Sequence, residues 1–239
     1  MSIVNNKGDY MSEHIEKHSR FSHLVRDAVI GLSDGLTVPF ALAAGLSGAL
    51  DSTKLIVTAG VAEIAAGAIA MGLGGYMASR TEADNYNSER RREELEIKNV
   101  PHKEEREVTE ILVQYGVPKS EALIVTNALK KDPVKWVDFM MRFELGLEKP
   151  DSSKIFQTPL TIGLSYIIGG LIPLLPYMIY DSAAKALPIS AIVTLIALAV
   201  FGAAKGAFTG LSIYKSAMQT TLIGGLAASV AFAAAKLLS

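Results

Sequence analysis

Apolar residues along this chain gather into five stretches, and polar residues gather between the second stretch and the third. The apolar stretches cover residues 27–50, 55–79, 158–180, 187–204 and 216–238. Each is close to the ~20 residues that a helix needs to cross about 30 Å of hydrocarbon. Charged residues concentrate between Arg80 and Lys154. The pattern predicts an all-α membrane protein with five transmembrane helices and a helical domain inserted between spans two and three.

This pattern also predicts how the chain is divided. We assign residues 1–20 to a polar cytosolic tail, 21–79 to spans one and two, 80–154 to the inserted helical domain and 155–239 to spans three to five. The tail lacks the apolar stretch of a signal peptide, so we expect the first span to remain uncleaved.

Proline and glycine mark where we expect helices to bend or end. Residues 82–98 are free of both and are expected to continue span two out of the membrane, up to Pro101. Three further helices are expected over 102–115, 120–131 and 133–145, the last capped by Asp132. Within the spans, Pro39 predicts a kink in the first. The prolines and paired glycines of 169–176 predict a broken or bent third span.

Two small-residue motifs predict close helix contacts. They are Gly31-x-x-x-Gly35 in the first span and Gly206-x-x-x-Gly210 after the fourth. The spacing does not decide whether either motif serves contacts within one chain or between two copies.

The positions of basic residues predict the orientation. An odd number of spans puts the termini on opposite sides, and Arg20, Arg26, Arg80 and Lys154 lie near span ends on one side. We therefore expect the N-terminus and the inserted domain in the cytosol and the C-terminus in a lumen or outside. The net charge of −1 gives no argument for nucleic acid, and the absence of Cys excludes thiolate ligands and cysteine nucleophiles.

Two acids fall inside the first two spans. Asp34 lies in the first, Glu63 in the second, and Met71 follows Glu63 by two helical turns. An ionised side chain at the bilayer centre costs roughly 2.5–3.5 kcal/mol on insertion scales, so such an acid indicates function. A nearby thioether suggests a path for transition-metal ions. The alternatives are that Asp34 caps a kinked helix or pairs with Arg26, that Glu63 is a buried neutral acid, and that Met71 serves packing.

The inserted domain carries further acids at helical spacings. The first stripe is Glu89, Glu93 and Glu96, the second Glu104, Glu107 and Glu110, and the third combines Met140, Met141 and Glu144. Carboxylates with thioethers suit Fe²⁺ or Mn²⁺, whereas carboxylates alone also take Ca²⁺. The alternative is a solvated, ion-paired surface, because Arg90, Arg91, Arg92 and Arg106 are interleaved with the acids, with the methionines filling the core.

Competing functions are less consistent with the sequence. A di-iron oxidase of the helical-bundle type uses Glu-x-x-His motifs as iron ligands. None of the four histidines follows a Glu at that spacing. His14 and His18 have the spacing of a helical chelate but lack further ligands nearby. A sensor or scaffold needs no acids inside the bilayer. The choice between a proton-coupled carrier and a channel stays open.

Four segments resemble the vacuolar iron transporter family. They are RDAVIGLSDGLTVPFAL at 26–42, AEIAAGAIAMGLGGYMAS at 62–79, DFMMRFELGL at 138–147 and GGLIPLLPY at 169–177. The resemblance extends over about 21–238. It implies a five-span homodimer in the membrane of a vacuole or other acidic organelle. It also implies exchange of cytosolic Fe²⁺, often also Mn²⁺, for protons, with no prosthetic group.

The resemblance also implies roles for individual residues. Asp34, Glu63 and Met71 would line the translocation path. The cytosolic metal site would comprise Glu93, Glu96, Glu104, Glu107, Met140, Met141 and Glu144. Since metal and proton compete for the same carboxylate oxygens, protonation on the acidic side would release the metal.

Overall fold

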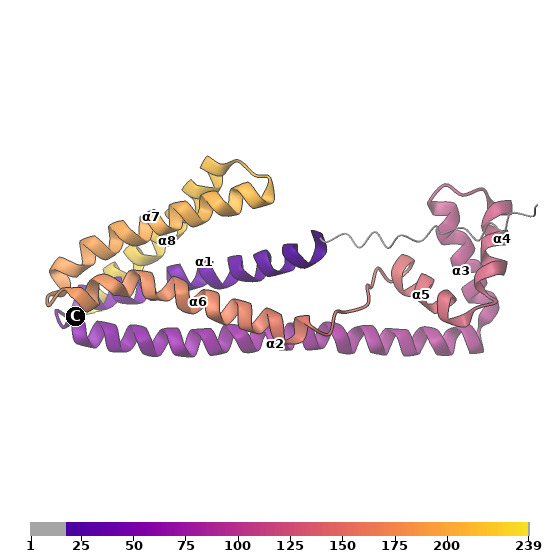
Figure 1. Ribbon diagram of the computed structural model, residues 1–239, viewed down its shortest axis with the longest axis horizontal. Coiled ribbons are helices and arrows are strands. Elements are labelled where there is room, and N and C mark those ends of the chain that lie inside the picture. Colours follow the sequence, from indigo (N-terminus) through magenta and orange to yellow (C-terminus); the bar gives the residue numbers. More distant parts are fainter. Residues whose placement is uncertain (1–17, 239) are drawn as a thin grey trace, which may run out of the picture. The chain divides into compact units, whose positions relative to one another are not determined.

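The computed structural model describes residues 18–238, with side chains from His23 onward. Its helices are α1 (His18–Ala49), α2 (Thr53–Asn99), α3 (Pro101–Gln114), α4 (Lys119–Leu129), α5 (Pro133–Phe143), α6 (Lys154–Ile179), α7 (Ala183–Thr209) and α8 (Ile213–Leu238) (Figure 1). Most of the polar tail assigned to 1–20, including His14, lies outside the described residues. Within residues 18–238 every secondary-structure element longer than an isolated bridge is a helix, which confirms the all-α prediction.

Five of these helices, α1, α2, α6, α7 and α8, are long and apolar enough to cross a membrane. The chain forms two compact units. We call residues 1–71 and 160–239 the membrane unit and residues 72–159 the insert unit. Helix α2 begins in the first and ends in the second without interruption, as expected from the absence of proline and glycine over 82–98.

Glycines let the helices of the membrane unit approach closely. A Cβ atom on Gly31 would come within 2.8 Å of the Ser165 side chain, and one on Gly35 would meet the backbone of Tyr166. A Cβ on Gly206 would lie 2.9 Å from the Ser216 side chain. Both glycines of the first motif thus serve contacts of α1 with α6, whereas in the second motif only Gly206 serves the contact of α7 with α8, and Gly210 ends α7 at positive φ.

Helix α6 runs from Lys154 to Ile179 without a break, so of the predicted break or bend only the break is wrong. Proline fixes φ near the helical value and removes only its own donor, and neighbouring helices compensate for the freed groups. The Ser190 hydroxyl of α7 also donates to the carbonyl of Pro173 at 2.7 Å, which joins α7 to α6 at this point. Helix α1 also continues through Pro39, where the kink stays a prediction.

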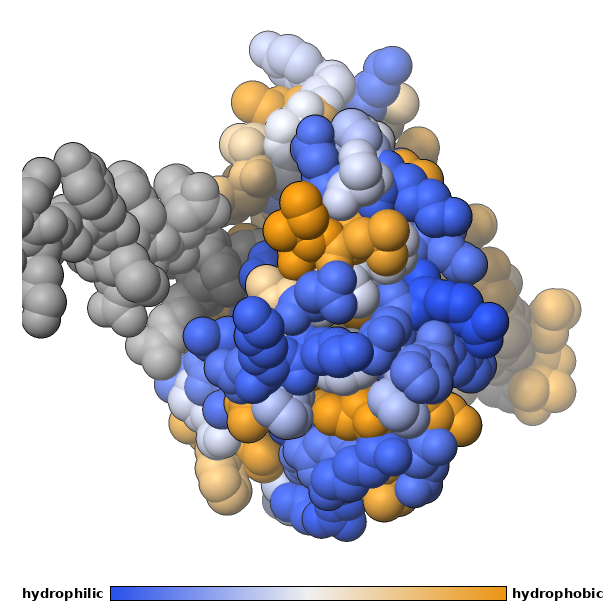
Figure 2. Space-filling view, turned by 90° about the vertical axis from the view of Figure 1, so that its right-hand side faces the viewer, coloured by the Kyte–Doolittle hydropathy of each residue, from blue (hydrophilic) through white to orange (hydrophobic). Residues whose placement is uncertain are grey.

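The insert unit has its own hydrophobic core. Buried side chains come from α2, α3 and α5, namely Tyr86, Ile97, Val108, Trp136, Val137, Met140 and Met141. Helix α5 begins as expected, because the Asp132 carboxylate accepts from the backbone N–H of Lys135. Gly116 and Gly146 adopt positive φ after α3 and α5. Figure 2, which views the end carrying α3 and α4, shows a mainly hydrophilic surface with small hydrophobic areas.

Candidate metal centres

Glu63 is an acid of the membrane unit whose two carboxylate oxygens have different surroundings. Its Oε1 accepts a hydrogen bond from the Tyr166 hydroxyl of α6 at 2.5 Å. Its Oε2 is buried and has no hydrogen-bond partner among the described residues. A buried oxygen without a partner is costly, so this atom is available for a cation or a proton.

Two glycines make room for Tyr166, whose side chain is almost fully buried. Gly67 follows Glu63 by one turn of α2, and a Cβ there would lie 2.5 Å from the Tyr166 hydroxyl. Gly35 admits the backbone of the same residue from α1. The sequence interpretation did not identify Tyr166. The available signal was a tyrosine inside an apolar span, whose hydroxyl needs a partner when buried.

Asp34 and Met71 lie on the same two helices as these groups. Asp34, in α1, is half-buried. Arg26, considered as its partner, instead donates to the neighbouring Asp27 at 3.1 Å. Met71 is half-buried on α2. Its role as a metal ligand remains a prediction.

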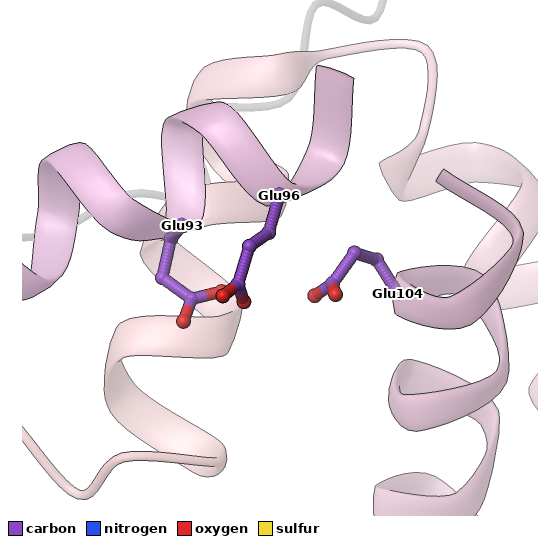
Figure 3. A group of neighbouring side chains, drawn as sticks. All are labelled: Glu93, Glu96 and Glu104. Atoms are coloured by element: carbon purple, nitrogen blue, oxygen red, sulfur yellow. The ribbon is translucent and has the colours of Figure 1, made fainter. Parts of the chain in front are cut away.

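The insert unit brings five of its acids together in two overlapping groups. Glu93, Glu96 and Glu104 each offer an oxygen, and these oxygens lie within 4.8 Å of one another (Figure 3). The second group, within the same limit, is Glu104, Glu107 and Glu144. Glu104 belongs to both. The acids come from the end of α2, the start of α3 and the residue after α5.

Burial distinguishes Glu93 and Glu104 from ordinary surface glutamates. Glu93 is 1% exposed and Glu104 is fully buried. They share helix faces with the core residues Ile97 and Val108, four positions further on in each case. Sequence spacing places an acid on a face, but only the packed helices exclude water from it.

Nearby cations do not satisfy these buried oxygens. Lys103 Nζ is 3.6 Å from Glu104 Oε1, and Arg92 Nη2 is 3.8 Å from Glu93 Oε1. Neither distance is a hydrogen bond. Both oxygens of Glu104, and Oε2 of Glu93 and of Glu107, are buried without a hydrogen-bond partner among the described residues. A bound cation or shared protons would offset this cost.

The same arrangement raises the affinity of the acids for protons. Burial, followed by repulsion from Glu144 and Glu104, raises the pKa of Glu93 to about 7. Burial and then repulsion from Glu107 raise the pKa of both Glu104 and Glu144. Near neutral pH Glu93 of the metal-free cluster is therefore partly protonated, and an arriving cation must displace that proton.

Other glutamates on these helices follow the alternative of an ion-paired surface. Glu89 pairs with Arg92 at 2.8 Å and Glu105 with Lys130 at 2.7 Å, while Glu110 is exposed. The ion-paired alternative therefore holds for Glu89, and metal binding by the buried acids stays a prediction.

Met140 and Met141 are 0% and 1% exposed and pack in the insert core beside Trp136 and Val137. This packing agrees with the interpretation of both as core residues. Their assignment as metal ligands stays a prediction.

Comparison with known proteins covers nearly the whole chain. The VIT family matches residues 25–236. Vacuolar iron transporter 1 of Arabidopsis thaliana is 53% identical over 236 residues, which are 99% of this chain and 94% of that protein. Its namesake in Eucalyptus grandis is 55% identical over 226 residues, 95% of this chain and 91% of that protein. Protein CCC1 of Saccharomyces cerevisiae is 36% identical over 248 residues, 98% of this chain and 76% of that protein. The chain belongs to the VIT family.

Proposed function

We propose that this protein carries Fe²⁺, and also Mn²⁺, from the cytosol into a vacuole or other acidic organelle in exchange for protons. The names of its relatives support iron as cargo and a vacuolar membrane as the location, and they describe transporters rather than enzymes. The observation that carries the proposal is the buried, unpartnered Oε2 of Glu63 inside a membrane-length helix. An ion path needs such an oxygen, whereas a purely structural acid would have both oxygens bonded.

Coupling follows from competition for the carboxylate oxygens. Glu63 must be ionised to bind Fe²⁺, so a cation and a proton exclude each other there. In the acidic compartment, protonation of Glu63 and Asp34 releases the metal. The protonated acids then return to face the cytosol and lose their protons. Met71 offers a thioether, which favours transition metals over Ca²⁺.

The insert unit collects metal before transport in this proposal. The five clustered acids of this unit are hard oxygen donors, which suit Fe²⁺ and Mn²⁺. The thioethers of Met140 and Met141 complete the donor set and disfavour Ca²⁺. Because the acids are crowded and Glu93 and Glu104 are buried, a divalent cation relieves both the mutual repulsion of the cluster and the lack of partners of its buried oxygens.

We further propose that the insert unit and the N-terminus face the cytosol, and that the C-terminus faces the lumen. The basic residues near span ends support this orientation. We expect a homodimer surrounded by membrane lipid, with metal ions as ligands and no nucleic-acid partner or prosthetic group.

Flux into proteoliposomes tests the function. Purified protein is reconstituted with an acidic interior, Fe²⁺ is added outside under reducing conditions, and internal pH is recorded. We expect Fe²⁺ uptake that alkalinises the interior and stops when the gradient is removed. Uptake that ignores the gradient would indicate a channel, and an absence of uptake would refute transport of this ion.

A further inference from the structure

An ion pair joins α2 to α5 beside the acidic cluster. Arg90 Nη1 donates to Asp138 Oδ1 at 2.5 Å. The same guanidinium lies 3.4 Å from the Tyr86 hydroxyl and, through Nε, 3.4 Å from Glu94 Oε1. Arg90 is 26% exposed and therefore partly shielded, in contrast to the surface arginines of the same helix. The bond to Asp138 raises the pKa of the Arg90 guanidinium.

Both residues of this ion pair lie shortly before residues of the acidic cluster or its assigned ligands on their own helices. Glu93 follows Arg90 by three residues on α2, and Met141 follows Asp138 by three on α5. Residues three apart lie on the same helix face. The pair therefore joins the two helices one turn before the residues that are assigned to the metal site.

The rest of the contact between these helices is mainly apolar. Trp136, Val137, Met140 and Met141 hold α5 in the insert core. Apolar burial is non-directional and tolerates small shifts along a helix, whereas a charge-assisted hydrogen bond demands one geometry. Glu144, directly after the last residue of α5, moves with that helix. An axial shift of α5 would separate Glu144 from Glu104 and Glu107.

We infer that Arg90 and Asp138 are positioning residues, which hold α5 in register on α2 so that Glu144 completes the acidic cluster. This inference rests on the proposed metal binding by the insert unit. In the proposed arrangement neither Arg90 nor Asp138 contacts the metal. Both act through the placement of α5.

Electrostatics alone makes a different prediction, which allows a clear test. Removal of the positive Arg90 would strengthen cation binding, and removal of the negative Asp138 would weaken it. A positioning role predicts that both changes weaken binding. It also predicts rescue when the two charges are exchanged between the helices.

The experiment uses the full chain in detergent with Mn²⁺ as the probe, which resists oxidation. Binding is followed by calorimetry and by the fluorescence of Trp136, the only tryptophan, which lies in the insert core. The variants are Arg90→Gln, Asp138→Asn and the exchanged pair Arg90→Asp with Asp138→Arg. Arg80→Gln and Asp84→Asn are matched controls, because that 3.1 Å pair is exposed and lies within α2 alone.

We expect each single change to lower Mn²⁺ affinity by about tenfold, the lower end of the range for residues that orient metal ligands, and the exchanged pair to recover most of it. The controls should bind as the unchanged protein does. Opposite signs for Arg90→Gln and Asp138→Asn, or unaltered affinity in both, would overturn the inference. Should a variant unfold, as shown by Trp136, Arg90→Lys replaces it and must still weaken binding. Failure of the unchanged protein to bind Mn²⁺ would instead refute the proposed insert site itself.

Discussion

Glu63 and Glu93 are both acids of helix α2 with a buried, unpartnered oxygen, but they have different surroundings. Glu63 has one hydroxyl partner, Tyr166, and one unpartnered oxygen. Glu93 lies in a cluster of carboxylates, whose repulsion adds to the effect of burial. One proton is enough to displace a metal ion from a single acid with few partners, as a transport step requires. A crowded cluster has a stronger demand for a cation, as a collecting site requires. The predictions below test this distinction.

The largest effect is expected from Glu63→Gln. The amide keeps the size of the side chain but cannot ionise, so Fe²⁺ uptake by proteoliposomes should be abolished. Mn²⁺ binding reported by Trp136 should be unchanged, because the insert cluster is intact. Glu82→Gln, an exposed acid on the same helix, is the control and should transport normally. Full uptake by Glu63→Gln would remove this acid from the path.

The converse change is Glu93→Gln combined with Glu104→Gln. Loss of both buried acids should lower the Mn²⁺ affinity of the insert by roughly 100-fold or more, above the range for groups that only support a ligand. Fe²⁺ uptake should continue at a reduced rate, since Glu63 remains. Calorimetry on the double variant measures this, with Glu82→Gln plus Glu110→Gln as exposed controls. Unaltered affinity would exclude these residues from the site.

A smaller effect is expected from Tyr166→Phe, which removes only the hydroxyl bonded to Glu63. Loss of an outer-shell partner typically costs 10–100-fold in metal affinity or activity, so we expect uptake to slow by about tenfold. Proton coupling should persist, because Glu63 still ionises. Tyr214→Phe, in a side chain that is 87% exposed, is the matched control. A variant with the normal rate would reduce Tyr166 to a packing residue.

The smallest effect concerns the stability of the metal-free insert. The pKa of Glu93 is raised from an ordinary value near 4.5 to about 7. The folded state thus binds the proton more tightly than the unfolded state does, and this stabilisation is complete below about pH 4.5. It is lost as pH rises through about 7. Unfolding followed by Trp136 fluorescence should therefore occur a few degrees lower at pH 8 than at pH 6.

Two variants check this pH dependence. Glu93→Gln should largely remove it, since the group no longer titrates, whereas Glu82→Gln should retain it. Saturating Mn²⁺ should raise the unfolding temperature most at the higher pH, where the acids are ionised. A stability that rises between pH 6 and pH 8 without metal would contradict the raised pKa.

The membrane-length helices could be predicted from sequence because hydrocarbon thickness sets their length directly. The helix boundaries of the insert followed from local chemistry, as with Asp132 capping α5 and the positive φ of Gly146. The expected break in α6 was wrong, because the fixed φ of proline is close to the helical value and each proline removes only its own donor, so local propensity overstates its effect inside an apolar span.

For the candidate sites, the sequence determined which residue types lie on which helix face. It placed Asp34 and Glu63 within apolar spans and the glutamates on stripes of α2 and α3. Tertiary structure decided which of these acids lose their water. Glu93 and Glu104 are buried and meet, whereas Glu105 and Glu110, on the same helix as Glu104, remain paired or exposed. It also decided that Tyr166 reaches Glu63 across 103 positions and that Arg90 reaches Asp138 across 48. Burial and long-range partners depend on helix packing, which no local spacing encodes.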